Sequence, residues 1–148
     1  MNNSVVVDTS VVVKWIVTVS DSDAARALLA EWTSKNIAIL APALLAYEAT
    51  NSLYKYIRAG QIPLEDAESG LRKVIFPLVT LDYSKEPLFS LRTIELASQF
   101  NLPATYDAHY LALAEQKGCN LWTADMRLWK AVQNKLTWVH NLSEYSIS

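Results

Sequence analysis

Ser4-Val5-Val6-Val7-Asp8-Thr9-Ser10 is the stretch of sequence that decides the fold of this chain. Its consecutive valines are apolar and β-branched, which is typical of a short strand buried on both faces. The acid and hydroxyl residues that follow suit a turn, and Ser10 can cap a helix that begins at Val11. The stretch therefore predicts a strand, a polar turn and a helix, the repeating unit of layered α/β domains.

The same alternation of short apolar runs and helical patterns continues along the chain. The predicted strands lie at residues 5–8, 37–40, 78–81, 120–123 and 137–139. The predicted helices follow Ser10 and span residues 23–34, 42–59, 64–76, 86–100, 105–118 and 125–134. Because parallel strands need helical crossovers, this order predicts an α/β domain with a mostly parallel sheet flanked by helices. Ligands of such sheets bind beyond the carboxyl ends of the strands, where Asp8, Thr123 and Asp125 are expected.

The bulk composition describes an ordinary globular chain. Its 148 residues fit one domain, residues 1–148, and 51% hydrophobic with 19% charged residues argues against disorder. Only 3 glycines are present, which disfavours a glycine-rich phosphate loop. The longest apolar runs are too short to span a bilayer or are interrupted by Asp8, so we expect a cytoplasmic protein with no membrane partner. The single cysteine, Cys119, cannot form an internal disulfide.

Net charge gives no general attraction to nucleic acid. The chain has 13 Lys and Arg against 15 Asp and Glu, a formal charge of −2. A polyanionic substrate would have to be drawn by local basic residues and bound cations, since divalent ions can reverse the sign of one cleft.

Carboxylates occupy places where a soluble domain usually has apolar or neutral residues: Asp8, Glu48, Asp107 and Asp125. Acids seldom become buried unless they are paired or bind a metal. If these groups converged within about 4 to 6 Å, they would repel one another by several kcal/mol per pair, so the cluster would need a cation. Oxygen ligands favour Mg²⁺, with Mn²⁺ as an alternative, and the lack of a His or Cys cluster disfavours zinc.

Each acid also has a purely structural explanation. Asp125 is a good helix N-cap, and Asp107 lies in a first helical turn, where the helix dipole favours negative charge. Asp8 can form an Asx-turn, and Glu48 can be a solvated residue at the margin of an apolar stripe. Taken one at a time, these explanations stay open.

The sequence resembles the PIN-domain family, in particular short single-domain VapC-type toxins. The resemblance rests on the Val-Val-Val-Asp-Thr-Ser run and the later stretches 42–51, 106–114 and 123–125, and it covers the whole chain. It implies a Rossmann-like sheet of strand order 3-2-1-4-5. It also implies that the four acids, Asp8, Glu48, Asp107 and Asp125, bind metal and are catalytic together with the hydroxyl of Thr123. Thr9 and Asn51 match positions that support such sites.

The resemblance further implies a magnesium-dependent endoribonuclease that cuts single-stranded or looped RNA. It implies the toxin of a type II toxin–antitoxin pair, held by a VapB-type antitoxin and forming a homodimer. The alternative is a PIN-like module that binds RNA or protein without cleavage. A phosphotransfer domain with Asp8 as nucleophile is disfavoured, because there is no second acid two residues later. Lys14 is a candidate phosphate contact, and the other basic candidates are Arg26, Lys55, Arg58, Arg72 and Lys73.

Overall fold

A five-stranded parallel sheet forms the centre of the protein in the computed structural model, which describes residues 3–147. The strands are β1 (Ser4–Val7), β2 (Ala38–Pro42), β3 (Val79–Asp82), β4 (Asn120–Thr123) and β5 (Val139–Asn141). Their order is β3-β2-β1-β4-β5, which confirms the predicted α/β class and the implied topology.

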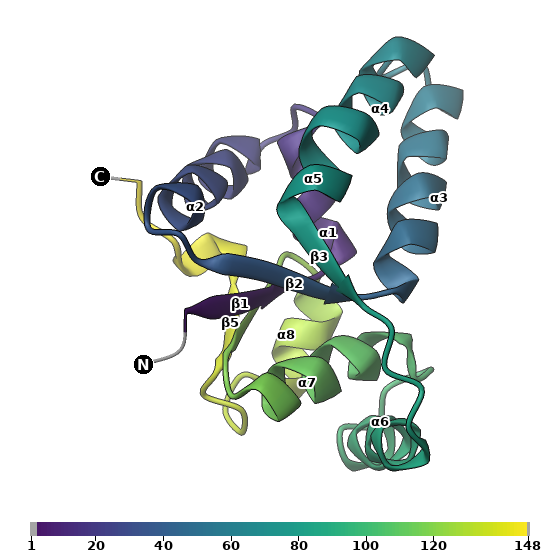
Figure 1. The fold of residues 1–148 in the computed structure, drawn as a ribbon, viewed down its shortest axis with the longest axis vertical. Coiled ribbons are helices and arrows are strands. Elements are labelled where there is room, and N and C mark those ends of the chain that lie inside the picture. The colour runs from purple at the N-terminus through teal and green to yellow at the C-terminus, as the bar shows by residue number, and fades with distance from the viewer. Residues whose placement is uncertain (1–2, 148) are drawn as a thin grey trace.

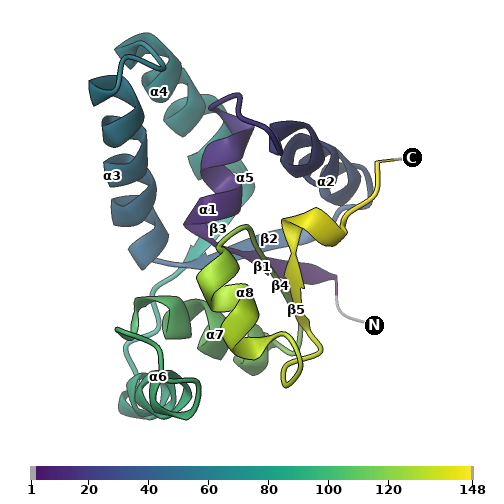
Figure 2. The same ribbon diagram turned by 180° about the vertical axis from the view of Figure 1, so that it is seen from behind.

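Helices cover both faces of the sheet. In chain order they are α1 (Thr9–Val12), α2 (Ser22–Ser34), α3 (Leu44–Arg58), α4 (Leu64–Gly70), α5 (Phe76–Leu78), α6 (Pro87–Gln99), α7 (Tyr106–Lys117) and α8 (Met126–Val132). Figures 1 and 2 show α1 to α5 on one side of the sheet and α6 to α8 on the other. This is the arrangement expected when every crossover is right-handed and the strand order reverses at the centre.

The valine run is the central strand of the sheet, as its composition predicts. Val6 lies opposite Leu40 of β2 and Leu121 of β4, and the valines of β1 are buried. A strand with neighbours on both edges and helices on both faces has no solvated side, which explains its uninterrupted apolar sequence.

Several predicted element boundaries are wrong, and proline or local hydrogen bonding explains them. The first helix begins at Thr9 rather than Val11, with Asp8 rather than Ser10 at the N-cap position. Pro42 ends β2 instead of opening the next helix, which begins at Leu44. The last strand spans Val139–Asn141 instead of residues 137–139.

The helix predicted to end before Pro77 continues past it. After α4 the backbone widens into a π-helical stretch, Leu71–Ile75, and α5 follows with Pro77 as its second residue. Proline is tolerated in a first helical turn, where its missing N–H would lack an intrahelical partner.

No helix within residues 3–147 is long and apolar enough to cross a membrane.

The carboxyl ends of the strands and the first turns of several helices lie at the same edge of the sheet. β1 has β2 on one side and β4 on the other, so the strand order reverses between β1 and β4. Asp8 directly follows β1 and Thr123 ends β4. Helices that alternate with parallel strands run the opposite way, so α3, α7 and α8 begin at this edge with Glu48, Asp107 and Asp125 in or beside their first turns.

Candidate functional site

Asp8 is the most buried of the four acids, with 4% of its surface exposed. The Ser10 hydroxyl donates to Oδ1 of Asp8 at 2.5 Å, and the buried Thr123 hydroxyl donates to Oδ2. These hydroxyls are held in turn by backbone N–H groups, since Ala124 donates to Ser10 at 2.8 Å and Asp125 donates to Thr123 at 3.0 Å. The carboxyl group after β1 is therefore fixed by the turn after β4.

Glu48 belongs to a second hydrogen-bonded group on the other side of the same turn. The hydroxyl of the buried Tyr110 donates to Oε1 of Glu48 at 2.6 Å, and the Thr9 hydroxyl donates to the same oxygen at 3.3 Å. The two hydroxyls lie 3.1 Å apart. Glu48 is thus held by α7 and by the turn after β1, and is not the solvated edge residue of the structural explanation.

Asp107 and Asp125 are partly buried and lie at the starts of their helices. Asp125 caps α8, with its Oδ1 accepting from the backbone N–H of Arg127 at 2.9 Å and of Leu128 at 3.4 Å. Its structural explanation is therefore correct, but the cap uses only one carboxylate oxygen. Asp107 is in the first turn of α7.

Electrostatics connects all four acids. Burial raises the pKa of Asp8 to about 7, with the charges of Asp107 and Asp125 adding to the effect and the hydrogen bonds from Ser10 and Thr123 opposing it. Partial burial also raises the pKa of Asp107, and the charges of Asp125 and Glu48 raise it further. Each acid therefore lies within electrostatic reach of at least one other, and burial is the largest cause of the raised pKa at both Asp8 and Asp107.

The geometry fits a hydrated cation better than a cage of carboxylates. Among residues 3–147, no three His, Cys, Asp or Glu side chains stand close enough together to hold a metal ion as they are. Both oxygens of Asp8 and Oε1 of Glu48 accept hydrogen bonds from hydroxyl groups, which hold these carboxylates in place. Mg²⁺ usually keeps several waters and binds through one or two carboxylates, so the all-oxygen donor set is chemically suited to it.

Predicted supporting residues have mixed outcomes. Thr9 joins the Glu48 group, whereas Asn51 is exposed on α3 and lies outside both hydrogen-bonded groups. Lys14 pairs with Asp21 at 3.0 Å with only 17% of its side chain exposed, so its charge is engaged within the fold. Of the other basic candidates, Arg26 bonds to the Trp15 carbonyl at 3.2 Å.

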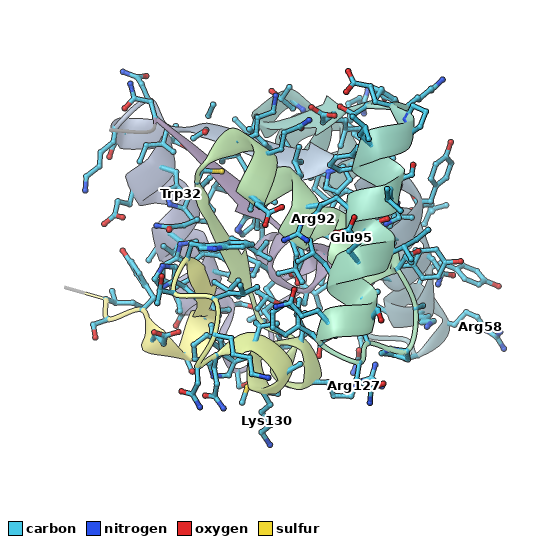
Figure 3. The ribbon with its side chains drawn as sticks, turned by 90° about the horizontal axis from the view of Figure 1, so that it is seen from below. Trp32, Arg58, Arg92, Glu95, Arg127 and Lys130 are labelled. Carbon is cyan, nitrogen blue, oxygen red and sulfur yellow. The ribbon has the colours of Figure 1, made fainter. Side chains whose placement is uncertain are left out.

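Three residues of the site were not predicted from the sequence. Ser10 was interpreted only as a helix cap, and Tyr110 only as part of an apolar stripe. The positive charge of Arg127 reaches Asp107 and opposes the rise in its pKa. Figure 3 shows Arg127 and Lys130 projecting from α8 along one edge of the molecule. Arg127 could have been identified as a site residue from its position two residues after the predicted helix cap Asp125.

A model of the PIN domain matches residues 5–134 of this chain. The chain belongs to the PIN domain family. No curated protein sequence gives a significant match. Among solved structures, the crystal structure of PAE2754 from Pyrobaculum aerophilum is similar to this PIN domain, with a TM-score of 0.66 and 25% sequence identity. The similarity covers 97% of this chain and 94% of PAE2754. PIN domains are typically nucleases, so the acids at the edge of the sheet belong to a nuclease fold.

Proposed function

We propose that this PIN domain is a magnesium-dependent endoribonuclease that cleaves single-stranded or looped RNA. One observation carries the proposal: the buried Asp8 carboxyl group lies within electrostatic reach of Asp107 and Asp125 at the point where the strand order reverses. Open α/β sheets bind their ligands there, and clustered acids are stabilised by a cation.

The chain's own residues have distinct roles in this proposal. Asp8, Glu48, Asp107 and Asp125 hold Mg²⁺, or Mn²⁺ in its place, directly or through water. When bound, the ion neutralises charge on the scissile phosphate and lowers the pKa of a water molecule for in-line attack. The Thr123 hydroxyl keeps Asp8 oriented, as the Tyr110 hydroxyl does for Glu48.

A local cation offsets the acidic character of the site. The charge of Arg127 already reaches Asp107, and this side chain is exposed at the start of α8. A guanidinium group there is suited to a phosphate oxygen next to the scissile bond. This weakens the objection raised by the net charge of −2, because two divalent ions would bring four positive charges to the cleft against its four carboxylates, and Arg127 adds one more.

Cleavage of a labelled single-stranded RNA in millimolar Mg²⁺ tests the activity. Asp8→Asn and Asp125→Asn should each reduce the rate by orders of magnitude, and chelation of the metal should do the same to the wild type. Asp66→Asn is the matched control, because Asp66 is an exposed acid in the first turn of α4, outside the site. Full activity in Asp8→Asn would remove the proposed role of the acid cluster.

The biological role we propose is that of a cytoplasmic toxin paired with a VapB-type antitoxin. Expression of the chain alone should arrest bacterial growth, and Asp8→Asn should relieve the arrest. A small protein encoded beside it should co-purify and restore growth. Harmless expression of a cleavage-competent wild type would contradict the toxin role but leave the nuclease in place.

A homodimer is part of the same proposal. Large apolar side chains are exposed along α3, α4 and α5, including Tyr54, Leu64 and Phe76. Apolar patches of this kind mark protein contacts when they are contiguous. Sedimentation of the purified chain at several concentrations tests the assembly, and a monomer at every concentration would reject it.

A second function is favoured by one observation. Within the described part of the chain the acids do not form a ready-made group of three. A PIN-like module that binds RNA or a protein without cleaving it would need no such group. It would bind single-stranded RNA with the same affinity in wild type and Asp8→Asn and show no cleavage with Mg²⁺ or Mn²⁺.

A further inference from the structure

A hollow of about 300 Å³ lies between the start of α3, the segment after β3, α6 and α7. Aromatic rings from four places in the fold line it: Tyr47 of α3, Tyr83 after β3, Phe89 of α6 and His109 of α7. Lys85, in the segment between β3 and α6, adds a positive charge to the wall. Elements far apart in sequence thus place several flat π-systems around one small space.

The hollow is joined to the acidic site through the backbone. Tyr47 immediately precedes Glu48 on α3, and His109 lies two residues after Asp107 on α7. Consecutive Cα atoms are about 3.8 Å apart, so the wall of the hollow and these two acids belong to the same few turns of helix. Side chains one or two residues apart on a helix face different directions, so the hollow and the acids occupy different faces of the same turns of α3 and α7.

The exposure of the two tyrosines is not explained by core packing. Tyr47 is 76% exposed and Tyr83 is 66% exposed, whereas a tyrosine that serves the core is largely buried, as Tyr110 is. The rings of Phe89 and His109 lie deeper and contact each other at a centroid distance of 6.3 Å in a tilted arrangement. The hollow therefore has a packed aromatic floor and exposed aromatic sides.

We propose that this hollow binds one unpaired nucleobase of the RNA, next to the phosphate held at the acids. The inference rests on the proposed ribonuclease function and adds a specificity-determining subsite to it. Proteins recognise single-stranded RNA by stacking unpaired bases on Tyr, Phe and His rings. The volume is at the lower end of ligand sites, which span about 300–1,000 Å³, and so suits one planar base rather than a folded segment.

The charges around the hollow agree with this occupant. Lys85 can contact the phosphate of the bound nucleotide, since ammonium groups act as point charges for phosphate. Asp82 also lines the hollow, but its carboxylate lies 3.7 Å from the Lys117 ammonium group and accepts from the Ser84 N–H at 2.9 Å. The wall therefore presents little net negative charge to an incoming nucleotide.

Binding of a short single-stranded RNA that carries one 2-aminopurine tests the subsite. The protein is kept in chelator at low salt, so that binding is measured without cleavage, and the fluorescent base is moved through the strand. Quenching should be strongest at one position, where the base stacks. Tyr47→Ala and Tyr83→Ala should each raise Kd by about 5- to 150-fold, the equivalent of about 1–3 kcal/mol for one stacked base.

Matched variants separate stacking from general effects. Tyr83→Phe keeps the ring and should bind within about twofold of wild type, since stacking needs no hydroxyl group. Ile94→Ala should also bind like wild type, because Ile94 is a comparably exposed apolar side chain on α6 that does not line the hollow. Lys85→Ala should reduce the slope of log Kd against log salt by about 0.7, the value for one phosphate contact on a single strand.

Unchanged Kd in both Tyr47→Ala and Tyr83→Ala would overturn the subsite, as would equal affinity for a duplex of the same sequence. If these variants keep RNA affinity but lose self-association or antitoxin binding, the hollow is a protein contact and the inference is wrong. Cleavage of RNA by Tyr variants with unchanged Kd would leave the proposed function standing without the subsite. Position-specific quenching in a protein that never cleaves RNA would support the subsite and reject the proposed ribonuclease function.

Discussion

Replacing Asp8 with Asn measures how much the ionised carboxylate after β1 lowers the free energy of unfolding. Burial, with the charges of Asp107 and Asp125, raises the pKa of Asp8 from 3.8 to about 7 in spite of the Ser10 and Thr123 hydrogen bonds. The difference of about 3 pKa units corresponds to about 4 kcal/mol, at 1.36 kcal/mol per unit. Ionised Asp8 therefore destabilises the metal-free protein by up to this amount.

The cost appears in a defined pH window. The folded state keeps the Asp8 proton up to about pH 7, whereas the unfolded chain releases it near the ordinary value of 3.8. Between these values the unfolded state binds fewer protons, so the free energy of unfolding falls as pH rises. Asn does not ionise, so Asp8→Asn should match the wild type below about pH 4 and exceed it by up to about 4 kcal/mol above about pH 7.

Thermal denaturation followed by circular dichroism, in chelator at about pH 5 and about pH 8, measures the difference. For a domain of this size 1 kcal/mol shifts Tm by about 2–4 °C, so Asp8→Asn should melt up to about 8–16 °C higher at the alkaline pH. Millimolar Mg²⁺ should raise the Tm of the wild type and leave the variant nearly unchanged, because only the wild type keeps the full set of acids. Asp66→Asn serves as the surface control. An Asp8→Asn stability difference that is the same at both pH values would refute this reasoning.

Three other substitutions test individual contacts. Tyr110→Phe removes the hydroxyl bond to Glu48 and should lower the free energy of unfolding by about 0.5–3 kcal/mol in urea titrations; an unchanged midpoint would show that the bond is not stabilising. Thr123→Val removes the buried hydroxyl that holds the acid after β1 and should cost about 1–3 kcal/mol, whereas Thr123→Ser should retain most of the stability; a loss in Thr123→Ser with none in Thr123→Val would assign the stability to the methyl group instead. Gly70→Ala places a Cβ 2.6 Å from Cδ1 of Ile16. The overpacking should lower the free energy of unfolding by about 1–3 kcal/mol and therefore also lower Tm. Ile16→Ala in the same chain should restore part of that loss, and no recovery would argue against the clash.

Most of the fold could be predicted because its signals are local. The valines of β1 and the regular alternation of strand and helix patterns indicate a parallel sheet, whereas the strand order 3-2-1-4-5 was expected only from the resemblance to the PIN family. The errors fall at the ends of elements, and two of them fall at Pro42 and Pro77, where the sequence offers two acceptable positions for proline. Pro42 occupies the last residue of a strand, and Pro77 the first turn of a short helix. Only packing of the whole chain selects between these positions.

The candidate site was predicted less completely than the fold. Acids that follow strands or open helices can be located from the sequence, because topology brings those ends together. The groups that hold them cannot be located in this way. Ser10 and Tyr110 contact partners 113 and 62 residues away, Thr123 and Glu48. Such contacts depend on helix rotation and side-chain direction, which periodicity does not specify.

The turn Asp8-Thr9-Ser10 ties two halves of the molecule with neighbouring side chains. Asp8 and Ser10 bond toward β4, whereas Thr9 bonds toward α3 and α7. Inserting one residue into this turn would break both sets of hydrogen bonds, because the side chains of Asp8, Thr9 and Ser10 would no longer point toward their partners. Grafts and insertions are therefore better made at the exposed connection between α3 and α4, which lies outside both the acids and the hollow.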